Sequence, residues 1–125
     1  MTKGLAFPLS MLVEGAVAAL FGVLLHKRFD RSRFGAAVRC AAAAVIGTGA
    51  TNPAMWAGFS RLEDWTGSWW GAVALGEAGV VLVEALFYAA ALRGRWRWSL
   101  ALSIAANAAA LGAGMLFASG AVRPL

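Results

Sequence analysis

Four apolar stretches, separated by short polar segments, make up most of the chain. They lie at about 5–25, 39–59, 69–92 and 98–118. Each has the roughly 20 residues that a helix needs to cross about 30 Å of hydrocarbon. The polar segments between them are short, and short connections join antiparallel helices. The pattern predicts an all-α, polytopic membrane protein, in which residues 1–125 form a single four-transmembrane-helix bundle.

Polar side chains interrupt these stretches at membrane depth. They are Glu14, Asn52, Glu77, Glu84 and Asn107. Glu77 and Glu84 are seven residues apart, about two helical turns, so both project from one face. A carboxylate at this depth costs several kcal/mol unless it is protonated, paired or wetted, and such residues usually mark a functional interior. We therefore expect the polar faces to converge in one acidic interior.

Three carboxylates that share an apolar interior cannot all stay ionised unless a cation is bound. This predicts an ion- or proton-binding site. Glu14 and Glu84 would carry the exchangeable charge, Glu77 would form the outer approach, and Asn52 and Asn107 would be neutral ligands. In the alternative, protonated glutamates bond to asparagines and backbone carbonyls and only hold the helices together.

The second stretch contains the segment GTGATNP, residues 47–53. Pro53 cannot donate a backbone hydrogen bond and its ring crowds the carbonyl of Gly49, so we expect the helix to kink or open. Thr48, Thr51 and Asn52 would then offer oxygens to a site, as interrupted helices do in transporters. The alternative is an ordinary proline kink, with the hydroxyls bonded back to carbonyls.

Composition and charge narrow the class of protein. Hydrophobic residues make up 61% of the chain and charged residues 14%, which excludes a soluble catalytic domain. Of the 11 basic residues behind the net charge of +5, eight follow the first and third stretches and three lie on the other side. By the positive-inside rule the basic loops are cytoplasmic and both termini are outside. We expect a multi-pass protein of the bacterial inner (plasma) membrane, with lipid as its partner and no nucleic acid.

The six tryptophans lie near the predicted ends of the stretches, which is typical of anchoring at a membrane interface. Ala18 and Gly22 are placed for close helix contact, as are Gly67 and Gly71. Cys40 has no partner for an internal disulfide and is expected to pack as a small apolar residue.

No motif in the sequence indicates a particular enzymatic reaction. There is no HExxH, no GxSxG and no glycine-rich phosphate loop, so no catalytic residue and no cofactor is predicted. The sequence does not predict whether a metal ion binds, although the oxygens of Glu and Asn side chains would suit a hard cation. An intramembrane enzyme with paired glutamates as acid and base is the least favoured possibility.

The function expected from these features is that of a small inner-membrane transporter or channel for a cation or a proton-coupled solute. So small a bundle has little room for a pathway in one copy, which favours a homodimer or a larger membrane complex. The alternative is a non-catalytic accessory subunit of such a complex, which would use its small-residue faces for assembly.

Overall fold

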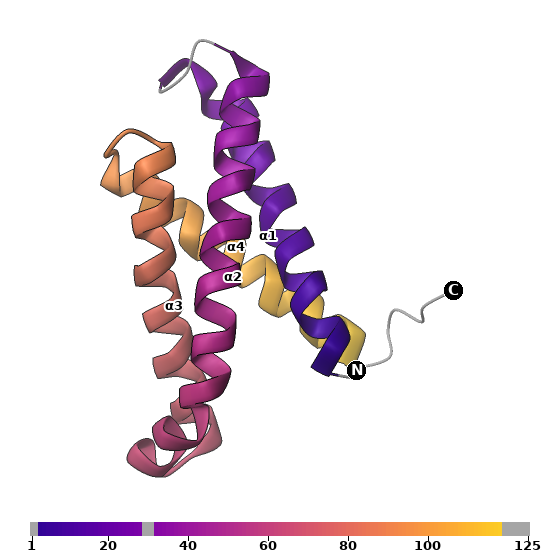
Figure 1. Cartoon of the computed structure of the whole chain (residues 1–125), viewed down its shortest axis with the longest axis vertical. Helices are drawn as coiled ribbons and strands as arrows, with labels where there is room; N and C mark the ends of the chain where they lie inside the picture. The colour runs from indigo at the N-terminus through magenta and orange to yellow at the C-terminus, as the bar shows by residue number, and fades with distance from the viewer. Residues whose placement is uncertain (1–2, 29–31, 119–125) are drawn as a thin grey trace.

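The computed structural model describes residues 3–28 and 32–118, almost all of them helical (Figure 1). The elements, in chain order, are α1 (Lys3–Leu25), a short 3-10 helix η1 (His26–Arg28), α2 (Arg33–Thr66), α3 (Trp69–Ala91) and α4 (Trp96–Ala118). All four α-helices are long and apolar enough to cross a membrane. The all-α class and the four apolar helices are confirmed. Arg31 and Arg123, two of the 11 basic residues, lie outside the described residues.

The four helices form a ring in which each packs against two neighbours. α1 contacts α2 and α4, and α3 contacts the same two helices. One end of the ring carries the α1–α2 connection, the α3–α4 turn and most of the basic residues, and we call it the basic end. The other carries the α2–α3 turn at Gly67 and Ser68, and we call it the turn end. Toward the turn end, α2 and α3 diverge from α1 and α4 (Figure 1).

Helix α2 is longer than its apolar stretch and continues through residues 60–66, where the sequence predicted a short polar connection between the second and third stretches. The helix begins after Ser32, whose hydroxyl accepts a hydrogen bond from the Gly35 N–H at 3.1 Å. It ends at Gly67, which has a φ of 69° and donates its N–H to the Glu63 carbonyl at 2.9 Å. Its 34 residues span about 50 Å, well beyond the roughly 30 Å hydrocarbon core of a bilayer. The extension toward Thr66 carries Arg61, Glu63 and Asp64, which are exposed and can be solvated beyond the hydrocarbon.

The buried core lies toward the basic end. It is built mainly from small residues of α2, with Ala18 of α1, Tyr88 of α3, Leu92 directly after α3 and Leu102 of α4. A Cβ on Gly22 would come within 2.6 Å of the Ala36 carbonyl oxygen, so the backbones of α1 and α2 touch there, as the small-residue pattern predicts. Cys40 is fully buried in this core, as expected.

Aromatic side chains cover the core at the basic end. The rings of Phe21 and Trp98 meet edge to face, with centroids 6.0 Å apart. The guanidinium of Arg28 lies over the Trp98 ring at 5.1 Å. The basic end of the ring is therefore closed by packed side chains.

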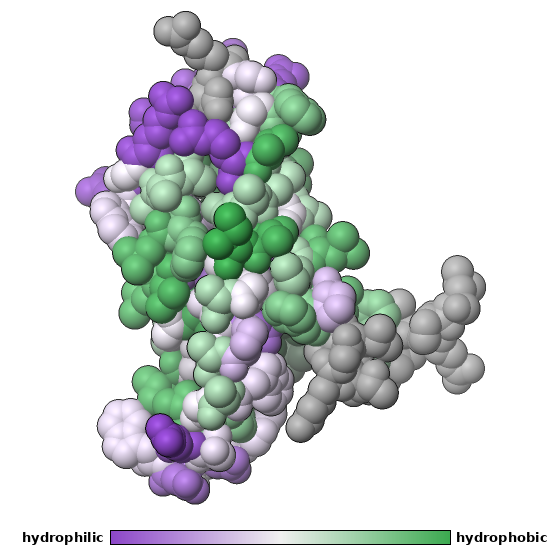
Figure 2. Space-filling model, viewed as in Figure 1, coloured by the Kyte–Doolittle hydropathy of each residue, from purple (hydrophilic) through white to green (hydrophobic). Residues whose placement is uncertain are grey.

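The surface is apolar around the middle of the molecule and polar toward both ends (Figure 2). Large apolar side chains such as Leu12, Leu24 and Leu82 are mostly exposed. A soluble monomer rarely exposes so much contiguous apolar surface. This distribution is typical of helices that face lipid.

Candidate functional site

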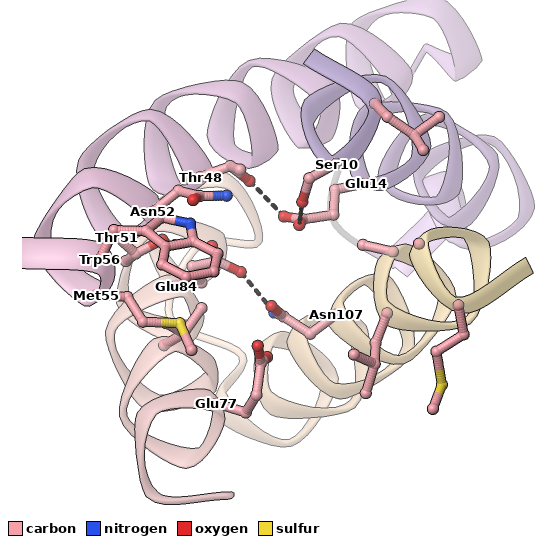
Figure 3. A pocket seen from close by; sticks show the side chains of 16 residues that line it. Ser10, Glu14, Thr48, Thr51, Asn52, Met55, Trp56, Glu77, Glu84 and Asn107 are labelled. Carbon is pink, nitrogen blue, oxygen red and sulfur yellow. Dashed lines mark hydrogen bonds between the residues drawn. The ribbon is translucent and has the colours of Figure 1, made fainter. Parts of the chain in front are cut away.

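A cavity of about 300 Å³ lies between the four helices, on the turn-end side of the core (Figure 3). The structure brings all of the predicted site residues to its lining. These are Glu14, Asn52, Glu77, Glu84 and Asn107. On each helix the core residues lie nearer the basic end than the cavity residues do. The cavity is therefore closed toward the basic end.

Glu14 lies on α1, where only 2% of it is exposed. One carboxylate oxygen, Oε1, accepts a hydrogen bond from the Ser10 hydroxyl at 2.7 Å, one turn earlier on the same helix. The other oxygen, Oε2, accepts from the Thr48 hydroxyl of α2. Both oxygens of this buried carboxylate thus have a donor.

Glu84 lies on α3, where only 1% of it is exposed. Its Oε1 is 2.8 Å from the Thr51 hydroxyl of α2, and its Oε2 accepts from the Asn107 amide of α4 at 2.6 Å. The Asn107 amide also donates to the Ser103 carbonyl at 3.0 Å. Room for the Glu84 side chain against α2 comes from Gly47, where an added Cβ would meet Glu84 Cγ at 3.3 Å. Glu84 therefore links three helices.

The Thr51 hydroxyl has two oxygens within reach but only one hydrogen to donate. It lies 2.8 Å from Glu84 Oε1 and 3.0 Å from the Gly47 carbonyl oxygen. With Glu84 ionised, Thr51 donates to Oε1. With Glu84 protonated, the carboxyl donates to Thr51, and Thr51 donates to the Gly47 carbonyl. The same geometry satisfies both protonation states of Glu84.

The donors around the two buried glutamates are all neutral. Ser10, Thr48, Thr51 and Asn107 orient the carboxylates but carry no positive charge. Among the described residues that line the cavity there is no Lys, Arg or His. A buried charge without a partner of opposite sign is costly. The two buried carboxyl groups therefore have no countercharge among the described residues that line the cavity.

Glu77 and Asn52 lie nearer the turn end of the cavity, and both are half-buried. No hydrogen bond involving either side chain is found within the described part of the chain. Trp56 and Met115, which line the same region, are 59% and 57% exposed. The cavity is therefore open on this side, where Glu77 lies two turns beyond Glu84.

Helix α2 runs without interruption through Pro53, so the expected opening of the helix is wrong. The Thr51 hydroxyl lies against the Gly47 carbonyl one turn earlier, which is the back-bonding of the alternative interpretation. The residues of 47–53 still contribute to the site, because Thr48, Thr51 and Asn52 all line the cavity. They do so from a continuous helix.

Sequence reasoning missed two polar groups and one aromatic residue. Ser10 lies four residues before Glu14, a spacing that puts both on one face and could have indicated the bond. Tyr88, one turn beyond Glu84, is fully buried in the core, and its hydroxyl has no partner among the described residues. Trp56 was assigned to the membrane interface alone, yet it lines the cavity.

Within residues 3–28 and 32–118, no three His, Cys, Asp or Glu side chains come together closely enough to hold a metal ion. The carboxylates line one cavity without forming a shared ligand shell. Comparisons with protein-family models, with curated proteins and with solved structures find no match to this chain.

Proposed function

We propose that this protein is a small transporter or channel of the bacterial inner membrane, which moves a cation or a proton-coupled solute through the acidic cavity. The observation that carries the proposal is the pair of buried carboxylates, Glu14 and Glu84, held only by neutral donors in a cavity with no basic residue among its described lining. Such a pair takes up a proton or a cation and releases one when the other binds. This is the elementary step of exchange.

The position of the cavity supports an alternating mechanism. It is open toward the turn end and closed by the core toward the basic end. The positive-inside rule places the basic end in the cytoplasm, so that the termini and the cavity mouth would face the outside. Passage then requires the core around Tyr88 and Leu102 to open while the helices come together at the turn end. Glu77 would provide the outer approach, and Asn52 and Asn107 neutral ligands.

Flux measured on the protein alone tests the proposal. Purified protein is reconstituted in liposomes with an entrapped pH dye, and proton and sodium flux are recorded under an imposed gradient. We expect flux to fall at least about tenfold in Glu14→Gln and in Glu84→Gln, because a loss of about 1.4 kcal/mol in binding already gives that factor. Glu63→Gln, which changes an exposed glutamate outside the cavity, is the matched control and should keep the wild-type flux. No flux, or flux that neither cavity variant alters, contradicts the proposal.

A second candidate is a non-catalytic accessory subunit of a larger membrane complex. An apolar groove between α2 and α3 favours it, with a volume of about 560 Å³. Ala50, Ala54 and Gly58 recur every four residues along the α2 side of the groove. Small residues at this spacing let another helix approach closely in a membrane. Copurification with a second subunit that is lost in Ala54→Leu would support this candidate.

A further inference from the structure

The acidic cavity has apolar walls between its buried carboxylates and its mouth. The wall residues come from all four helices and are Leu9, Met55, Trp56, Val80, Leu111 and Met115. The cavity volume of about 300 Å³ lies at the lower end of the range found for small-molecule sites. Such sites combine mainly apolar walls with a few polar groups that orient the ligand. The cavity is thus large enough, and apolar enough in its walls, to hold a small organic molecule.

The carboxylate oxygens are poorly arranged for a bare metal ion. Calcium takes six to eight oxygen ligands, and magnesium requires near-octahedral geometry. The described residues contain no group of three acidic, His or Cys side chains that could hold a metal. Each oxygen of Glu14 and Glu84 is already engaged by a Ser, Thr or Asn side chain. The buried end of the cavity offers negative charge without a closed shell of ligands.

We infer that the cavity binds a monovalent organic cation, an amine or quaternary ammonium that carries an apolar group. The charged nitrogen lies toward Glu84 and Glu14, and the apolar group lies against Trp56 and Met115. Trp56 points into the cavity in Figure 3, and an indole face attracts an organic cation. Methionine side chains adapt to ligands of different shape. This inference rests on the proposed function, because it assigns a ligand class to the same cavity.

Binding to the purified protein in nanodiscs tests the ligand class by isothermal titration calorimetry. The probe is benzyltrimethylammonium, which combines a positive charge with an apolar ring. Benzyl alcohol supplies the ring without the charge, and sodium chloride supplies the charge without an apolar group. We expect saturable binding of benzyltrimethylammonium at one site per chain, and no saturable heat from either control compound.

Two pairs of matched variants locate the binding in the cavity. Glu84→Gln should weaken binding at least about tenfold, while Glu63→Gln, at an exposed position outside the cavity, should bind like the wild type. Trp56→Leu should weaken binding about threefold, the size of one exposed cation–π contact. Its matched control is Trp65→Leu, nine residues along α2 and outside the cavity lining.

The outcomes separate this inference from the proposed function. Absence of saturable binding, binding that Glu84→Gln and Trp56→Leu both leave unchanged, or displacement of the probe by sodium or magnesium at lower concentration overturns the organic-cation site. If glutamate-dependent proton or sodium flux is present while the probe does not bind, transport stands and the ligand class is wrong. If the probe binds as expected and neither an imposed ion gradient nor a gradient of the probe produces flux, the ligand class stands and transport is wrong.

Discussion

At the scale of single residues, the Thr51 hydroxyl shows how an ionisable group can be accommodated in an apolar interior in either charge state. Thr51 bridges Glu84 and the Gly47 carbonyl, and its one hydrogen can serve either oxygen. A change of protonation at Glu84 therefore requires the rotation of one hydroxyl and no movement of a helix. Under the proposed function, such a pair would suit a carboxyl that exchanges its proton repeatedly.

Replacement of Thr51 tests how much this hydroxyl contributes to the stability of the folded protein. Thr51→Val keeps the size and removes the donor, so that Glu84 Oε1 stays buried without a partner. We expect the free energy of unfolding to fall by about 1–3 kcal/mol, the cost of an unsatisfied buried polar group. Thr51→Ser keeps the hydroxyl and should lose less. Circular dichroism of the detergent-solubilised proteins measures the free energy of unfolding of both variants. Equal stability of Thr51→Val and the wild type would show that the hydrogen bond contributes nothing to stability.

The polar residues of the site could be predicted from the sequence, but their pairing could not. Depth along each apolar stretch indicated Glu14, Glu84 and Asn107 because charged and amide groups are costly there. Which donor meets which carboxylate depends on how far each helix is rotated about its own axis. Thr48 reaches α1 and Thr51 reaches α3, although the two threonines are only three residues apart on α2. Hydropathy gives the depth of a residue and leaves this rotation undetermined.

At the scale of elements, the lengths of α1, α3 and α4 followed closely from their apolar stretches, whereas that of α2 did not. The apolar run ends near Phe59, but the helix continues to Thr66. Hydropathy marks the part of a helix that is apolar enough for lipid, while capping residues mark where the helix ends. Ser32 and Gly67 were present in the sequence as such signals. Gly67 was interpreted instead as a position for close helix contact, but nothing lies within 4 Å of an added Cβ there.

The close contact between α1 and α2 can be tested by adding one methyl group at Gly22. In Gly22→Ala the new Cβ would lie 2.6 Å from the Ala36 carbonyl oxygen, and backbone cannot move aside cheaply. We expect the free energy of unfolding to fall by about 1–3 kcal/mol from overpacking. Gly112→Ala on α4 is the matched control, because nothing lies within 4 Å of its added Cβ and alanine favours helix. A thermal unfolding midpoint for Gly22→Ala equal to that of Gly112→Ala would contradict the contact.

At the scale of the whole molecule, the two ends of the bundle differ in charge and in packing. The basic end has Arg93, Arg95 and Arg97 at the α3–α4 turn and is closed by the core. The turn end has diverging helix pairs and the mouth of the cavity. If positive charge is retained in the cytoplasm, the open side of the cavity faces outward. A ligand that enters from outside the cell would then meet Glu77 first, so the charge of the loops determines the side from which the cavity is reached.

Labelling of introduced cysteines decides this orientation. In a Cys40→Ala background, which removes the buried native thiol, Trp65→Cys places a thiol at the turn end and Trp96→Cys places one at the basic end. Both positions are exposed and neither substitution changes a charge. We expect a membrane-impermeant maleimide to modify Trp65→Cys in intact spheroplasts and Trp96→Cys only after permeabilisation. The reverse pattern would place the cavity mouth in the cytoplasm, and Glu77 would then face solutes leaving the cell.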